Sequence, residues 1–196
     1  MTLAGRNASR LNIVGNAHKL TARYLDGKEK IEQLKIAYSY YSEAMEMASD
    51  KYSGQYLDAL SNMLFIGHIL ETLGDGKLLK RLQKSKLFKE VTDLPKYLTE
   101  YRQELDDFDK ADLDISVLIG MTEISYAILL ISNDNKGHHD QKILGWYKDI
   151  FNQIYSPRYI KIEMSQIDFL LDYVKDEEII ECLEALKTEL ENLLNN

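Results

Sequence analysis

The chain contains 196 residues, the length of one ordinary domain or of a compact array of repeats. Hydrophobic residues make up 45% of it, which is enough for a sizeable core and argues against a disordered protein. With 24 basic and 32 acidic residues the net charge is −8, so nucleic acid and an anionic membrane are disfavoured as main partners. Two prolines and ten glycines are too few for the frequent turns of an all-β sandwich or barrel.

The cysteine count and the hydropathy pattern indicate a soluble protein of a reducing compartment. Cys182 is the single cysteine, which excludes an internal disulfide and a four-cysteine zinc site. No apolar leader follows the first ten residues. The longest mostly apolar stretch, residues 115–131, is interrupted by four polar residues, among them Glu123, and is too polar for a membrane span. We therefore expect a cytoplasmic protein with no membrane partner.

Apolar residues recur at spacings of three and four almost throughout the chain, which is the pattern of amphipathic helices. We predict an all-α protein with eight or nine helices, arranged as stacked antiparallel helix pairs. The helix 110–132 is apolar on more than one side and is expected at the centre of the packing. The predicted helices span residues 7–25, 28–48, 53–73, 77–91, 94–108, 110–132, 140–155, 156–174 and 176 to near the C-terminus.

Helix-end signals support these boundaries. Ser53 is placed to cap the N-terminus of the third helix, and the Ser156-Pro157 pair to start the eighth. Gly74 stands directly after the third helix, where a glycine commonly ends a helix. Segment 133–137 is predicted to be a loop because it is rich in asparagine, aspartate and glycine.

Three predicted helices carry an aliphatic residue followed by glycine, and the glycines lie 52 and 53 residues apart. They are Gly15, Gly67 and Gly120. A glycine inside a helix costs about 1 kcal/mol relative to alanine, so a packing reason is expected. We interpret each glycine as a place where another helix approaches closely, and the even spacing as an internal repeat, although chance placement among ten glycines remains the alternative.

Several motifs resemble the tetratricopeptide repeat, a helix–turn–helix unit of about 34 residues. The match departs from that family where Ser49-Asp50 replaces the closing proline, and in the longer spacing of the repeats. The motifs are Ala37-x3-Tyr41-x2-Ala44, Ile66-Gly67-x2-Leu70, Val14-Gly15-x2-His18 and, more weakly, Tyr147-x3-Phe151.

This resemblance implies one divergent, tetratricopeptide-like helical domain over residues 1–196, an α-solenoid of the kind found in larger bacterial multidomain proteins. The best motif match covers residues 11–75. Residues 110–155 would form a further helix pair, and residues 156–196 would be C-terminal capping helices.

The same resemblance implies a protein–protein interaction module or scaffold, which binds a peptide or a sister domain on a concave helical surface. The partner would be another protein or other domains of a longer parent chain, and an oligomer is compatible with this interpretation. The candidate groove residues are polar or aromatic positions on the first helices of each pair: Asn16, Lys19, Arg23, Tyr56, Asn62 and His68.

Two charged segments suggest further docking surfaces. Residues 77–89 contain six basic residues and no acid, and residues 104–114 contain six acids against one lysine. Both could be ordinary solvated helix faces, or surfaces of opposite sign that orient a partner. Lys80, Arg81 and Lys84 are the partner-binding candidates of the basic segment.

The sequence predicts no catalytic residue, no cofactor and no metal. His18 and His68 are isolated, and His138-His139 lies in a predicted loop. Acidic neighbours of Cys182 disfavour a reactive thiolate. One alternative function is a structural oligomerisation bundle. Another is a helical nuclease, because Arg10 followed by His18 is distantly similar to the arginine–histidine pair of the HEPN superfamily.

Overall fold

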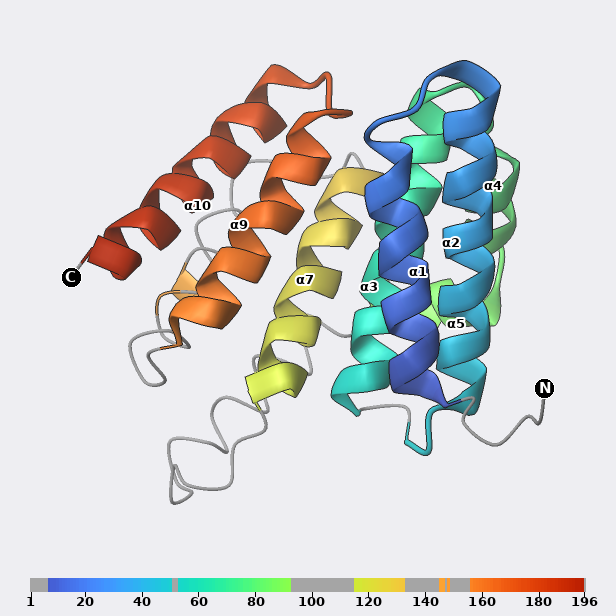
Figure 1. The fold of residues 1–196 in the computed structure, drawn as a ribbon, viewed down its shortest axis with the longest axis horizontal. Helices are drawn as coiled ribbons and strands as arrows, with labels where there is room; N and C mark the ends of the chain where they lie inside the picture. The colour runs from blue at the N-terminus through green and yellow to red at the C-terminus, as the bar shows by residue number, and fades with distance from the viewer. Residues whose placement is uncertain are drawn as a thin grey trace.

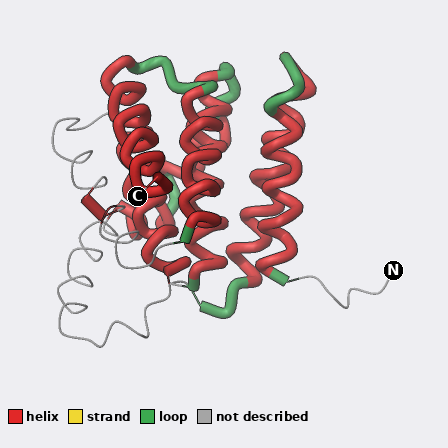
Figure 2. Tube along the Cα trace, turned by 60° about the vertical axis from the view of Figure 1, so that its left-hand side comes forward, coloured by secondary structure: helices red, strands yellow, loops and turns green. Residues whose placement is uncertain are grey.

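The computed structural model describes residues 7–50, 53–92, 115–132, 145, 146, 148 and 156–195. Every regular element in these residues is an α-helix, which confirms the all-α prediction. Figures 1 and 2 show the helices side by side, with the described loops at the helix ends. The helices are α1 (Ala8–Ala22), α2 (Gly27–Met47), α3 (Gly54–Thr72), α4 (Lys77–Gln83), α5 (Lys86–Thr92), α7 (Ile115–Ser132), α9 (Pro157–Leu171) and α10 (Glu177–Asn195).

The predicted helix-end signals are confirmed. The Ser53 hydroxyl accepts a hydrogen bond from the backbone N–H of Tyr56 at 3.3 Å, which caps α3. Ser156 is the N-cap of α9, with Pro157 at its first position. Gly74 follows α3 with a φ of 87°, a left-handed conformation that glycine adopts without strain.

The prediction of one basic helix over residues 77–91 is wrong, because α4 and α5 are separate helices. The break lies at Ser85, whose backbone N–H bonds to the carbonyl of Leu82 at 2.9 Å. The Ser85 hydroxyl then accepts from the backbone N–H of Phe88 at 3.2 Å. A serine that bonds to nearby backbone groups in this way ends one helix and starts the next.

Several predictions fall outside the described residues. These are the helix 94–108, the acidic segment 104–114, the loop 133–137, and His138-His139. Of the predicted helix 140–155, the structure describes residues 145, 146 and 148, which are helical.

The core is built around α3, in which 13 of 19 residues are buried. This helix packs against α1 and α2 and also against α7, while α9 packs against α10. Residues 119–125 of α7 are all buried, so α7 shares the interior with α3, in agreement with its predicted central place. Figure 1 shows α7 between α3 and α9. None of the helices described here is long and apolar enough to cross a membrane.

The mid-helix glycines lie at close helix contacts, as expected from the sequence. A Cβ atom at Gly120 would stand 2.6 Å from the Cβ of Leu57 on α3. At Gly15 it would stand 3.0 Å from the ring of Tyr41 on α2. Gly67 faces Leu79 of α4 less tightly, at 3.4 Å. Of these three glycines, Gly120 therefore leaves the least room for a side chain.

Candidate functional site

A pocket of about 320 Å³ lies between α1, α3, α7 and α9. Its rim is open to solvent, because Ile13, Gln55 and Ile162 line it and are exposed. Its interior is covered, because Ile119 and Gly120 line it and are buried. This volume is at the lower end of the range for ligand pockets and is enough for one long side chain or a small molecule.

Three carboxyl groups from three helices line the pocket: Asp58 on α3, Glu123 on α7 and Glu163 on α9. Glu123 and Glu163 are only 7% and 2% exposed, and glutamate is seldom so buried unless it is paired. The hydroxyl of Ser61 donates to Glu123 Oε2 at 2.7 Å. The side chain of Asn62 donates to Asp58 Oδ1 at 2.9 Å.

The negative charges of Asp58, Glu123 and Glu163 repel one another. Burial raises the pKa of Glu123 well above its usual range, and the negative charges of Glu163 and Asp58 raise it further. The hydrogen bond from Ser61 and the charge of Lys19 oppose that shift. Burial likewise raises the pKa of Asp58 against the charge of Lys19. The pocket therefore holds protons more tightly than exposed carboxyl groups do.

Lys19 lies behind the pocket and joins three helices. Its Nζ donates to Asn62 Oδ1 on α3 at 2.6 Å and to Gln166 Oε1 on α9 at 2.7 Å. The ammonium also stands 5.4 Å from the centre of the Phe169 ring, within the range of a cation–π contact. Burial lowers the pKa of Lys19, while the neighbouring carboxylates act in the opposite direction.

Two asparagines of α1 add to the polar lining. Asn12 is 5% exposed and donates to the backbone carbonyl of Gln55 at 2.9 Å. Its Oδ1 is buried and has no hydrogen-bond partner in the described part of the chain. Asn16 Oδ1 accepts from the hydroxyl of Tyr41 at 2.7 Å. The orphaned Asn12 oxygen is a costly feature unless a ligand donates to it.

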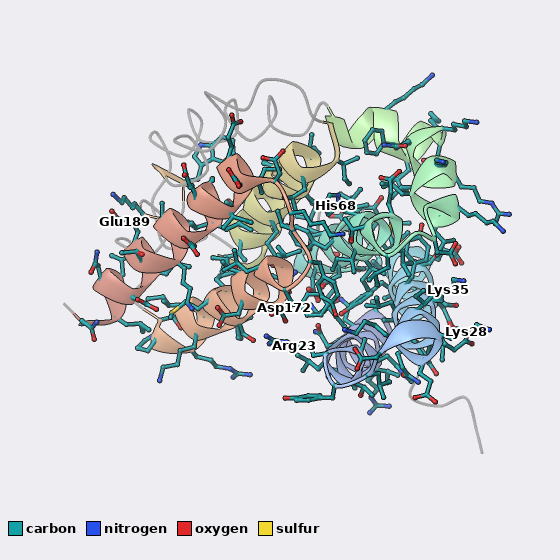
Figure 3. The ribbon with its side chains drawn as sticks, turned by 90° about the horizontal axis from the view of Figure 1, so that it is seen from above. Arg23, Lys28, Lys35, His68, Asp172 and Glu189 are labelled. Atoms are coloured by element: carbon teal, nitrogen blue, oxygen red, sulfur yellow. The ribbon has the colours of Figure 1, made fainter. Side chains whose placement is uncertain are left out.

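A second set of contacts joins the end of α9 to α1 and α2. Arg23 and Asp172 form an ion pair with a separation of 2.9 Å, and Figure 3 shows the two residues next to one another. The ammonium of Lys30 lies 5.4 Å from the centre of the Tyr173 ring. These contacts lie at the C-terminal end of α9, while the pocket residue Glu163 lies within the helix.

The sequence-predicted binding residues fall into different places. Asn16 lines the pocket, and Lys19 and Asn62 are buried directly behind it. Arg23 is engaged in the ion pair with Asp172. Tyr56 is buried in the core.

The other predicted binding residues do not line the pocket. His68 is partly buried on α3, and burial lowers its pKa. Lys80, Arg81 and Lys84 are all exposed at α4, which does not line the pocket. The structure thus brings Asn16, Lys19 and Asn62 together, but neither His68 nor the basic segment joins them.

Sequence reasoning missed the main pocket residues, Asn12, Asp58, Glu123 and Glu163. One signal was present: Glu123 is the single acid within the most apolar segment of the chain. An acid at such a position is buried and needs polar partners. The sequence does not show which distant residues supply them.

The residues considered for catalysis have ordinary surroundings. His18 Nδ1 is 2.7 Å from Gln33 Oε1, and its ring stacks on Tyr40. Arg10 is exposed, and Cys182 is partly buried. In the described ranges no group of three or more histidine, cysteine, aspartate or glutamate residues is arranged to hold a metal ion.

Comparison of the chain with protein-family models, with the curated proteins and with the solved structures finds no match. Its function is therefore inferred from the geometry and chemistry of its own pocket.

Proposed function

We propose that this chain is a protein–protein interaction module and that the pocket between α1, α3, α7 and α9 anchors a side chain of its partner. The observation that carries this proposal is the composition of the pocket: two exposed isoleucines at its rim and buried carboxyl groups in its interior. Ile13 is 65% exposed and Ile162 is 48% exposed. Binding energy in protein interfaces is concentrated where an anchor fills a pocket and apolar rim contacts exclude water.

The resemblance to the tetratricopeptide repeat supports the same function. Ala37, Tyr41 and Ala44 carry the motif of a second helix, and all three are fully buried. Gly15 lies beneath the ring of Tyr41, in keeping with a paired-helix unit. A cytoplasmic scaffold built from such pairs, belonging to a larger bacterial protein or assembly, remains part of this proposal.

Photo-crosslinking tests the location of the binding surface. A photoreactive amino acid placed at position 162 is expected to crosslink the partner, while the same amino acid at position 47 is not. Met47 is a matched control because it is 45% exposed and does not line the pocket. With the captured partner purified, Ile162→Asp is expected to weaken binding at least tenfold, and Met47→Asp to leave it unchanged. Equal crosslinking or equal weakening at both positions contradicts the proposal.

The basic segment at α4 is tested in the same assay. Its side chains are exposed and of one sign, which favours an acidic partner surface. If reversing the charges of Lys80, Arg81 and Lys84 to glutamate abolishes binding while Ile162→Asp does not, the docking surface is at α4 rather than at the pocket.

A structural oligomerisation bundle is the second candidate, favoured by an apolar strip on α1. Ile13 and Leu20 are exposed and lie seven residues apart, which places them on one face of α1, and the exposed Tyr24 follows in the turn after the helix. Sedimentation velocity distinguishes this function: a dimer that dissociates in Leu20→Lys but not in Met47→Lys supports it, and a monomer at all concentrations removes it.

A further inference from the structure

We propose that one face of α4 binds one face of α10 on a second copy of this chain, so that copies associate head to tail. The inference goes beyond the partner-binding function and does not use the pocket. The two faces carry opposite charge and consist of exposed side chains. The basic face is Lys77, Lys80, Arg81 and Lys84, and the acidic face is Glu177, Glu181 and Glu184.

The four cations of the basic face lie on one side of α4. Lys77 is followed by cations three, four and seven residues later, which is the spacing of a single helix stripe. The other side of α4 carries Leu79 and Leu82, which are 0% and 5% exposed. Helix α4 packs against α3 through this apolar side, where Leu79 faces Gly67. The fold therefore uses the apolar side of α4 and leaves the basic face exposed.

The positive charge of the basic face is largely unopposed. Lys80, Arg81 and Lys84 form no ion pair within the part of the chain that the structure describes. The pKa of Asp75 is lowered by the hydrogen bond from Lys35 and further by the charge of Lys77. Because Asp75 already pairs with Lys35, it does not neutralise the stripe.

The acidic face of α10 has the same construction. Glu177, Glu181 and Glu184 follow one another at spacings of four and three, and all are exposed. None of the three forms an ion pair among the described residues. Lys187 lies one turn from Glu184 but pairs with Asp168 of α9 at 2.7 Å. The apolar residues on the opposite side of α10 are buried; they are Ile179, Leu183, Leu186 and Leu190.

Each face holds like charges close together, at a cost to its own helix. Lys80 and Lys84 are four residues apart, as are Glu177 and Glu181, and like charges at this spacing destabilise a helix. The helix dipole favours an anion at the start of α10 and cations at the end of α4, but it disfavours Lys77 at the start of α4. Contact between the faces replaces repulsion within each with attraction between them.

The charge spacings of the two faces match. The glutamates of α10 follow the order four then three, which Lys77, Arg81 and Lys84 repeat on α4. Lys77, Lys80 and Lys84 give the reverse order, three then four. Because every α-helix has the same rise per residue, equal spacings in sequence are equal distances along the axis. Each glutamate can therefore meet a cation whether α10 runs parallel or antiparallel to α4.

The two faces lie at opposite ends of the molecule, so a single copy cannot join them. Figures 1 and 3 show α4 and α10 separated by α1, α3, α7 and α9. Two basic faces repel one another, so the contact joins unlike faces of two copies. Such a contact leaves one face free at each end of the pair, and association continues beyond the dimer.

A second copy fits the basic face better than a long polyanion does. The chain has a net charge of −8, so an anion that extends beyond α4 meets a remainder that is more negative still. At physiological ionic strength charges interact over about 8 Å, which confines a favourable contact to the two faces. A helix of seven residues offers little area, and exposed ion pairs contribute little each. The association is therefore weak and sensitive to salt.

Sedimentation equilibrium of the full chain measures this association. The weight-average mass is expected to rise with concentration and to exceed that of a dimer at about 1 mM protein in about 20 mM salt. It should return to the mass of the monomer in about 500 mM salt, because salt screens exposed charges.

Reversing the charge of either face should abolish the association, and mixing the two variants should restore it. Each variant alone carries two faces of the same sign. In the mixture, the reversed faces complement one another and so do the unchanged faces. The variants are Lys80→Glu/Arg81→Glu/Lys84→Glu and Glu177→Lys/Glu181→Lys/Glu184→Lys.

Single exchanges repeat the test if circular dichroism shows that a triple variant has lost helix. Arg81→Glu and Glu181→Lys should each weaken the association at least threefold, and their mixture should recover it. The control for net charge reverses three exposed lysines outside α4 and should leave the association unchanged. It is Lys28→Glu/Lys161→Glu/Lys175→Glu.

Several results would overturn the inference. One is a chain that stays monomeric at the same concentration in low salt. Others are an equal loss of association in the control for net charge, or no recovery in the mixture of the two reversed variants. If Leu20→Lys dissociates the assembly and neither charge reversal does, the apolar strip of α1 makes the contact instead. Crosslinking at position 162 is independent of these results, so the proposed partner surface is judged separately.

Discussion

Gly120 shows how one absent side chain sets the distance between two helices. A Cβ atom added there would lie 2.6 Å from the Cβ of Leu57, and neither atom is the end of a flexible chain. Gly120→Ala is therefore expected to force α7 away from α3 and to lower the free energy of unfolding by about 1–3 kcal/mol. Urea denaturation monitored by circular dichroism measures the change.

Gly145→Ala is the control for this prediction. Residue 145 is helical, and among the described residues no heavy atom lies within 4 Å of the position of an added Cβ. Alanine there should leave stability unchanged or raise it by up to about 1 kcal/mol, because alanine is the better helix former. A Gly120→Ala variant as stable as Gly145→Ala would show that the contact is not a tight one.

At this scale, the sequence predicts close contacts better than it predicts the pocket. A glycine in the middle of a helix carries a local cost, so its position alone indicates a neighbouring helix. Asp58, Glu123 and Glu163 lie far apart in the chain, and each is an ordinary acid in its own segment. Only the packing of α3, α7 and α9 brings the three carboxyl groups to one cavity.

Among the helices, α3 depends on its cap as well as on its burial. Ser53 supplies the hydroxyl that accepts from the N–H of Tyr56, beside the Gly54 and Gln55 wall of the pocket. Ser53→Ala is expected to lower the free energy of unfolding by about 1 kcal/mol. Thr188→Ala is the matched control, because that hydroxyl bonds back to the carbonyl of Glu184 within an exposed helix surface. Thermal unfolding should show a clear loss for the first variant and little change for the second.

Helix ends were predictable where the signal is local. The Ser53 cap, the Ser156-Pro157 start and the Gly74 stop each involve residues within a few positions of one another. The same rule explains the error at residues 77–91, because Ser85 bonds to Leu82 and Phe88 and was not recognised as a cap. Local hydrogen bonds compete with the continuation of a helix wherever serine occurs.

The packing of α9 on α1 could not be predicted from the sequence, for a different reason. The contact of Lys19 with Gln166 joins residues 147 positions apart, and that of Arg23 with Asp172 joins residues 149 apart. The spacing of apolar residues along either helix does not identify the helix that packs against it. The apolar positions predict that each helix has a buried face, but they do not predict which other helix covers it.

The buried charges determine how the stability of the whole molecule should vary with pH. A carboxyl group whose pKa is higher in the folded than in the unfolded chain binds its proton more tightly when folded. The stability that Glu123 and Asp58 contribute is therefore greatest below the unfolded pKa of about 4 and falls as the pH rises toward their folded values. The pKa of Lys19 is lowered in the folded chain, so the unfolded chain binds this proton more tightly. Lys19 therefore makes the free energy of unfolding increase with pH on the alkaline side, up to about pH 10.4, where the unfolded lysine loses its proton.

Replacing the Glu123 carboxyl with an amide isolates this contribution from the many exposed acids. Glu123→Gln keeps an oxygen that can accept from Ser61 but removes the buried charge, so at pH 8 it should raise the free energy of unfolding by about 1 kcal/mol. The gain should shrink as the pH is lowered and vanish below the usual glutamate pKa of about 4, where the wild-type Glu123 is protonated in both states. Glu181→Gln, at an exposed position of α10, should leave stability unchanged at every pH. Urea denaturation across this range measures the difference, and a gain that grows toward acid pH would mean that Glu123 is ionised and well paired in the folded protein.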